Sequence, residues 1–165
     1  MIKRAFSIFV FIVLALFSST KAAFAGDVAG SSAMPKKMVI DDQIDWRELK
    51  LYAFLKKKDS SLARYSADFI QAADAWGIDW RLLPAIAGLE SSFAKRMVPG
   101  TYNAYGWGGG YIVFDNWADS IEHVSKRLRE IYYDNGLITP TQIGPVYAPP
   151  NPRWGNLIAS IINQI

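Results

Sequence analysis

The chain has 165 residues, and 51% of them are hydrophobic, which is enough apolar material for one globular domain. The formal net charge of +3 comes from 18 basic and 15 acidic residues, but Lys3, Arg4 and Lys21 lie in a predicted signal peptide. Its removal leaves 15 residues of each sign, so the composition argues against a nucleic-acid-binding protein. The sequence contains no cysteine, which excludes disulfides and a lipid-modified cysteine anchor.

Residues 1–25 are typical of a secretory signal peptide. A positively charged start is followed by an apolar run from Ala5 to Phe17 and by an A-x-A cleavage site ending at Ala25. The apolar run is shorter than the roughly 20 residues of a membrane-spanning helix. We therefore expect export to the periplasm, the cell surface or the medium, with membrane contact only during translocation.

The rest of the chain divides into a leader and one domain. Residues 26–43 lack hydrophobic periodicity, which predicts a disordered leader, and residues 44–165 form the predicted domain. Helical spacing of apolar residues, together with the capping residues Ser60, Ser61, Asp79 and Asn116, predicts several helices in this domain. The predicted helices are 44–57, 61–76, 82–90, 117–133 and 154–165, with a short helical turn from Thr139 to Gly144.

The helix at 82–90 ends at a lone carboxylate, Glu90. Leu83, Ile86 and Leu89 recur at helical spacing, and Glu90 falls on a stripe that it shares with Leu83 and Ala87. Burial against apolar side chains raises the pKa of a carboxyl group, and the negative end of the helix dipole acts in the same direction. Glu90 is therefore a candidate general acid, and a glutamate that simply turns to solvent at the helix end is the alternative.

Aromatic residues and glycines are concentrated between Tyr102 and Phe114. Because glycine permits tight turns and close approach of the backbone, we expect a short irregular β-hairpin beside Glu90. Tyr105 and Trp107 flank the glycine turn and are candidates for packing against sugar rings. A hairpin that only covers the core is the alternative.

The segment ESSF, from Glu90 to Phe93, and the segment NAYGWGG that begins at Asn103 resemble the lysozyme-like superfamily. The resemblance is closest to the bacterial endo-β-N-acetylglucosaminidases, which include flagellar and autolysin-type peptidoglycan hydrolases. It implies a mainly α (α+β) fold, a lysozyme-like helical domain with a small β-hairpin lobe. It also implies that Glu90 is the catalytic acid and that Ser91 and Asn103 bind the substrate beside it. Tyr147, in a Tyr-Ala dipeptide of the loop before the last helix, is implied as a further substrate-binding residue.

Two features depart from the family's pattern. The proline-rich stretch 149–152 replaces an acidic residue that usually follows the Tyr-Ala dipeptide, and Ser92 and Phe93 stand where the family has a glycine. Bond specificity therefore stays open, with a lytic transglycosylase or muramidase of the same fold as alternatives. A noncatalytic cell-wall glycan-binding module is a further alternative, and an assembly protein that docks a partner through Trp76 and Trp80 is another.

The resemblance implies cleavage of a β-1,4 bond between amino sugars in peptidoglycan glycan strands, with Glu90 protonating the departing oxygen. Asp115 is a weak candidate for a second carboxylate, because an acidic residue near a helix start has an ordinary electrostatic explanation. Without a second carboxylate, the 2-acetamido group or the muramyl 6-hydroxyl of the substrate serves as nucleophile. We expect a monomer with no cofactor and no metal, because His123 is the only histidine and has no second ligand at metal-binding spacing.

Overall fold

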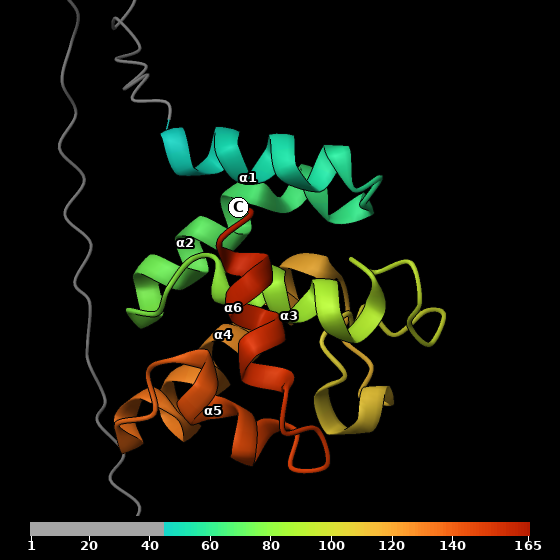
Figure 1. The fold of residues 1–165 in the computed structure, drawn as a ribbon. Coiled ribbons are helices and arrows are strands. Elements are labelled where there is room, and N and C mark those ends of the chain that lie inside the picture. The colour runs from blue at the N-terminus through green and yellow to red at the C-terminus, as the bar shows by residue number, and fades with distance from the viewer. Residues whose placement is uncertain (1–44) are drawn as a thin grey trace, which may run out of the picture. The chain divides into compact units, whose positions relative to one another are not determined.

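The computed structural model describes residues 45–165, so the predicted signal peptide (1–25) and leader (26–43) lie outside the described residues. The expectation of a mainly helical protein is confirmed within this part of the chain, which contains six α-helices, three short 3₁₀ turns and no strand (Figure 1). None of these helices is long and apolar enough to span a membrane. The helices are α1 (Trp46–Lys57), α2 (Ser66–Trp76), α3 (Leu82–Ser91), α4 (Trp117–Ile131), α5 (Pro140–Tyr147) and α6 (Trp154–Ile162).

Three of the six helices, α1, α4 and α5, begin at a residue whose side chain caps them. Asp45 accepts a hydrogen bond from Arg47 N at 2.8 Å at the start of α1, and Asn116 accepts one from Asp119 N at 3.0 Å at the start of α4. The start of α3 differs from the prediction. Arg81 is its N-terminal flanking residue, and Asp79 lies one turn earlier, where it accepts from Arg81 N at 2.9 Å.

The predicted β-hairpin between Tyr102 and Phe114 is not formed. This segment is an irregular loop with a 3₁₀ turn at Trp107–Gly110 and contains no strand residue. Its glycines explain the difference, because Gly106 and Gly108–Gly110 all have φ between 58° and 85°. A run of left-handed residues curls the backbone and prevents the extended pairing that a hairpin needs.

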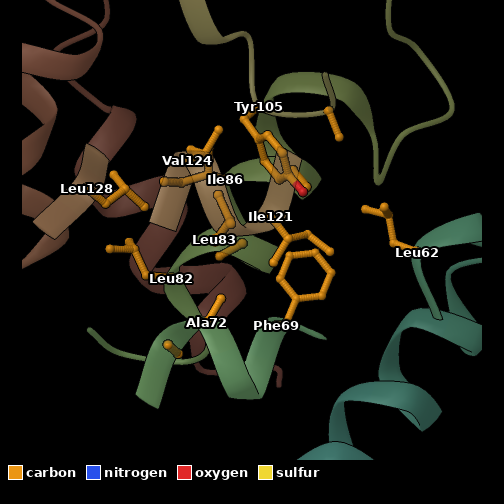
Figure 2. Close-up of a cluster of buried hydrophobic side chains, with 14 of the residues drawn as sticks. Leu62, Phe69, Ala72, Leu82, Leu83, Ile86, Tyr105, Ile121, Val124 and Leu128 are labelled. Atoms are coloured by element: carbon orange, nitrogen blue, oxygen red, sulfur yellow. The ribbon is translucent and has the colours of Figure 1, made fainter. Parts of the chain in front are cut away.

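All six helices contribute buried side chains to the hydrophobic core. Phe69, Ile86 and Ile121 are at most 2% exposed and lie in one cluster of buried side chains (Figure 2). The last helix, α6, packs against both α3 and α5 (Figure 1). The contact with α5 is close at Gly155, where an added Cβ would lie 2.6 Å from Pro140 O. Through this packing, the start of α6 lies beside the end of α3, where Glu90 is located.

Candidate functional site

Glu90 is the penultimate residue of α3 and lines an open pocket of about 490 Å³. Its Oε1 accepts a hydrogen bond from Trp154 Nε1 at 2.8 Å. Trp154 is only 1% exposed, so a buried indole fixes one carboxylate oxygen at the edge of the pocket. The prediction that Glu90 lies against apolar surface is wrong, because the residue is exposed. Its side chain is oriented by a specific donor and remains accessible to a ligand.

The second carboxylate oxygen of Glu90 lies beside the backbone of Gly106. A Cβ added to Gly106 would come within 3.1 Å of Glu90 Oε2, and the residue has a φ of 66°. A side chain at this position would therefore meet both a left-handed backbone and the carboxylate. Glycine allows the loop to pass directly over the candidate acid.

The chain leaves α3 through an unusual left-handed turn. Ser92, Phe93 and Ala94 have φ values of 53°, 60° and 66°, although none of them is glycine. Consecutive left-handed residues with side chains are energetically unfavourable and persist only where surrounding contacts hold them. Backbone strain of this kind is concentrated at functional sites in proteins, and here it begins two residues after Glu90.

Contacts from distant parts of the chain hold this turn. The Phe93 ring packs on Gly88, where an added Cβ would lie 2.6 Å from it, and it meets Phe54 of α1 edge-on at 5.6 Å between ring centroids. Ser60 Oγ donates to Phe93 O at 3.0 Å. Ring packing and a hydrogen bond thus fix the conformation that the local sequence alone does not favour.

Ser91 lines the pocket, but its hydroxyl serves the protein's own backbone. It donates to Ala87 O at 3.0 Å and accepts from Ala94 N at 2.8 Å, and the residue is 3% exposed. The resemblance implied that Ser91 contacts the substrate. In this structure its side chain stabilises the turn after Glu90 instead.

Asn103 also lines the pocket and holds the glycine loop in place. Its Nδ2 donates to Trp107 O at 2.8 Å and to Ile112 O at 3.1 Å, and its Oδ1 accepts from Trp107 N at 3.1 Å. The residue is 2% exposed, so its amide is fully engaged inside the loop. Its role in a site is to position Trp107 and the neighbouring glycines.

The prediction that Tyr105 presents its ring to a sugar is wrong. The side chain is fully buried and appears among the core residues in Figure 2. Within residues 45–165 its hydroxyl has no hydrogen-bond partner, and burial raises the pKa of the phenol. The ring of Tyr105 is therefore part of the core. Its backbone carbonyl, which accepts a hydrogen bond from Tyr147, is what contacts the site.

Aromatic rings lie on the other side of the glycine loop. Trp107 and Tyr147 lie 5.9 Å apart between ring centroids, and Tyr147 stacks on Trp154 at 4.8 Å. Together with Tyr132 and three glycines, Trp107 and Tyr147 line a second pocket of about 250 Å³. The two pockets share Gly106 and Gly109, so the glycine loop borders both.

Tyr147 is the last residue of α5, whereas the resemblance implied a loop position. Its hydroxyl donates to Tyr105 O at 2.6 Å. Burial raises the pKa of Tyr147 well above its usual value, and the negative charge of Glu90 raises it further. The phenol is therefore a neutral hydrogen-bond donor that ties α5 to the glycine loop.

Glu90 is the only acidic residue among those lining the two pockets. Asp115 and Asp119 are exposed and line neither pocket, and Asp119 Oδ2 accepts a hydrogen bond from Asp115 N at 3.3 Å. The described part of the chain contains no cluster of three metal-binding side chains. His123 is exposed and packs against Phe114 at 5.4 Å between ring centroids.

Three residues of this site were missed by sequence reasoning: Gly106 as a contact of the acid, Trp154 as its hydrogen-bond donor, and Arg96 as a lining residue. Trp154 lies 64 residues after Glu90 in the sequence. No local pattern connects the two, although a tryptophan at the start of a helix after a proline-rich turn could have been tested as a site residue.

Comparison with known proteins does not assign the chain to a family. No protein-family model matches the chain, and no curated protein matches it. The lysozyme-like resemblance therefore stays a prediction that rests on the motifs around Glu90 and Asn103 and on the order in which they occur.

Proposed function

We propose that this protein is an exported peptidoglycan hydrolase that cleaves β-1,4 bonds between amino sugars, in the manner of an endo-β-N-acetylglucosaminidase. One observation carries the proposal. Glu90 is a lone carboxylate in an open pocket, held through Oε1 by the buried indole of Trp154 and bordered by an aromatic second pocket. An oriented, accessible acid beside aromatic rings suits the cleavage of a glycan.

In this proposal Glu90 donates its proton to the glycosidic oxygen as the bond from that oxygen to C1 breaks. Trp154 keeps the carboxyl group in one orientation, because its N–H donates to Oε1. Positioned proton transfer of this kind contributes roughly 10²- to 10⁴-fold to a rate. After the first sugar leaves, the Glu90 carboxylate accepts a proton from the attacking water.

The nucleophile is proposed to come from the substrate. Glycosidases with two carboxylates place them roughly 5 to 9.5 Å apart, and Glu90 is the only carboxylate that lines the two pockets. The carbonyl oxygen of the 2-acetamido group can instead form a bond to C1 while the leaving oxygen takes the proton. Water then attacks C1, the bond from the acetamido oxygen to C1 breaks, and the proton of the water passes to the Glu90 carboxylate. If the muramyl 6-hydroxyl attacks in place of water and gives its proton to the same carboxylate, the product is a 1,6-anhydro sugar and the enzyme is a lytic transglycosylase.

The two pockets provide a path for the strand across the glycine loop. The partly buried ring of Trp107 lines the aromatic pocket, where it can pack on a pyranose face. The other pocket contains Glu90 and the loop 96–98. A strand that lies in both pockets would pass Gly106, directly beside the carboxylate.

The test is product analysis by mass spectrometry after purified peptidoglycan is incubated with the mature protein. Wild type is expected to release muropeptides. Glu90→Gln keeps the shape of the side chain but removes the acid, so the rate of release should fall by a factor of at least about 10². Asp115→Asn is the matched control and should retain activity, since Asp115 is exposed and lines neither pocket. The fragment ends distinguish a glucosaminidase from a muramidase or a transglycosylase. Binding without release by wild type would instead favour a noncatalytic glycan-binding module.

A further inference from the structure

Arg96 is the only basic residue among those lining the two pockets. It lies in the pocket of Glu90, on the loop that follows the left-handed turn. Its backbone N–H donates to Ser91 O at 2.7 Å, which ties this loop to the residue next to Glu90. The protein therefore places one cation and one acid in the same open pocket.

The guanidinium of Arg96 forms no hydrogen bond or ion pair with another residue in 45–165. Four other arginines in this range, Arg47, Arg81, Arg127 and Arg129, each form an ion pair with a neighbouring carboxylate at 2.6 to 2.8 Å. Arg96 and Glu90 form no such pair, although they line the same pocket. Both side chains are thus available to a ligand.

The left-handed turn gives this arrangement its physical basis. Ser92, Phe93 and Ala94 each adopt a positive φ that disfavours a residue with a side chain by about 1–3 kcal/mol. With these conformations the chain reverses within four residues, and Arg96 N reaches Ser91 O. An ordinary extended exit from α3 would carry Arg96 away from the helix end and out of the pocket.

We propose that Arg96 binds a carboxylate of the substrate and so makes the site selective for anionic glycan strands. This inference rests on the proposed function and adds the class of strand that the site prefers. Guanidinium groups form strong, directional hydrogen bonds with carboxylates. Peptidoglycan offers a carboxylate from two sources, the peptide stem or, after the stem is removed, the lactyl group of the muramyl sugar, whereas chitin oligosaccharides offer none.

The test compares wild type, Arg96→Gln and Arg96→Lys on three substrates: peptide-bearing strands, strands stripped of peptides by an amidase, and chitohexaose. Arg96→Gln should lower kcat/KM on the carboxylate-bearing strands about tenfold, as expected for one charge-assisted hydrogen bond, and leave chitohexaose within about twofold. Arg96→Lys should recover part of the loss. Arg64→Gln is the matched control, because Arg64 is exposed and lines neither pocket.

The pattern of losses identifies the carboxylate. The expected loss on both anionic substrates means that Arg96 binds either carboxylate. A loss only on peptide-bearing strands assigns it to the stem, and a loss only on stripped strands assigns it to the lactyl group. An equal loss on all three substrates, chitohexaose included, or no loss on any, would overturn the inference.

Binding of each substrate, followed by intrinsic tryptophan fluorescence, separates this inference from the proposed function. If wild type binds the anionic strands but cleaves nothing, the hydrolase proposal fails, and the Arg96 inference stands if Arg96→Gln weakens only the binding of anionic strands. Unchanged binding by that variant overturns the inference whatever the fate of the enzyme proposal. Absence of all binding by wild type overturns both.

Discussion

Helix α3 and the loop that follows it, 92–114, are adjacent in the sequence and opposite in character. Six consecutive residues of α3, from Leu82 to Ala87, are buried, and the helix is regular throughout. The loop contains nine of the twelve residues with positive φ in the described part of the chain, and Arg96, Val98 and Gly106 are exposed. Glu90 lies at the boundary between these two regions.

This contrast shows how the molecule separates stability from site geometry. Buried apolar area stabilises α3, and the helix gives Glu90 a rigid base. The loop contributes few buried side chains, but its left-handed residues bring Gly106 beside the carboxylate and Arg96 into the same pocket. Substitutions in α3 should therefore act mainly on folding, and substitutions at the boundary mainly on activity.

The largest effect is expected for Ile86→Ala, which removes a fully buried side chain from α3. Truncation of a buried isoleucine leaves a cavity and lowers the free energy of unfolding by about 2–5 kcal/mol. Urea denaturation monitored by circular dichroism measures this free energy of unfolding. Ile112→Ala is the matched control in the loop, where Ile112 is 41% exposed, and should change stability by less than about 1 kcal/mol. Equal effects at the two positions would contradict the division between the regions.

Trp154→Phe should come next, because it keeps a ring in the core and removes the N–H that donates to Glu90 Oε1. We expect kcat to fall about tenfold on peptidoglycan as the carboxyl group loses its fixed orientation. Release of muropeptides over time is the measurement. Trp117→Phe controls for the change of ring size, since Trp117 is also buried but lies at the start of α4. Full activity of Trp154→Phe would exclude a positioning role for the indole.

Tyr147→Phe tests the partly buried phenol that joins α5 to the loop. Loss of its hydrogen bond to Tyr105 O should lower the free energy of unfolding by about 1 kcal/mol at neutral pH. The raised pKa of Tyr147 adds a dependence on pH, because above about pH 10 the unfolded chain ionises this phenol while the folded protein does not. The stabilisation present below that pH is lost as pH rises.

Wild type should therefore lose stability above about pH 10 more steeply than Tyr147→Phe does. Urea denaturation at neutral pH and at about pH 10.5 measures the difference. Tyr52→Phe, at an exposed position on α1, is the control and should leave the slope unchanged. If the stability of wild type and of Tyr147→Phe falls equally with rising pH, the Tyr147 phenol does not contribute to this pH dependence.

The smallest effect is expected for Ser92→Gly, the first residue of the strained turn. Glycine adopts a φ of 53° without the steric penalty of a Cβ, so stability should rise by about 0.5–1 kcal/mol. The same change at Ser160, inside α6, should lower stability by about 0.5 kcal/mol. Thermal denaturation of the two variants shows whether each change raises or lowers stability. A loss of stability in Ser92→Gly would mean that the turn is not strained.

Local sequence patterns predicted most of the helices. Apolar spacing depends only on near neighbours, so the helices at 61–76 and 117–133 were placed closely, although the first begins as a 3₁₀ turn at Ser61–Tyr65. The hairpin between Tyr102 and Phe114 was wrong, because glycine-rich composition does not reveal the sign of φ. Left-handed glycines and extended glycines look alike in a sequence.

The sequence by itself determined that α3 is apolar and ends at Glu90, since helical periodicity and residue type are local properties. Only the tertiary structure decided that Trp154 donates to Glu90 and that Tyr105 is buried. It also decided that Arg96 returns to the end of α3. These features depend on which helix faces pack together and on the strained turn that their packing holds, and neither follows from the spacing of residues along the chain.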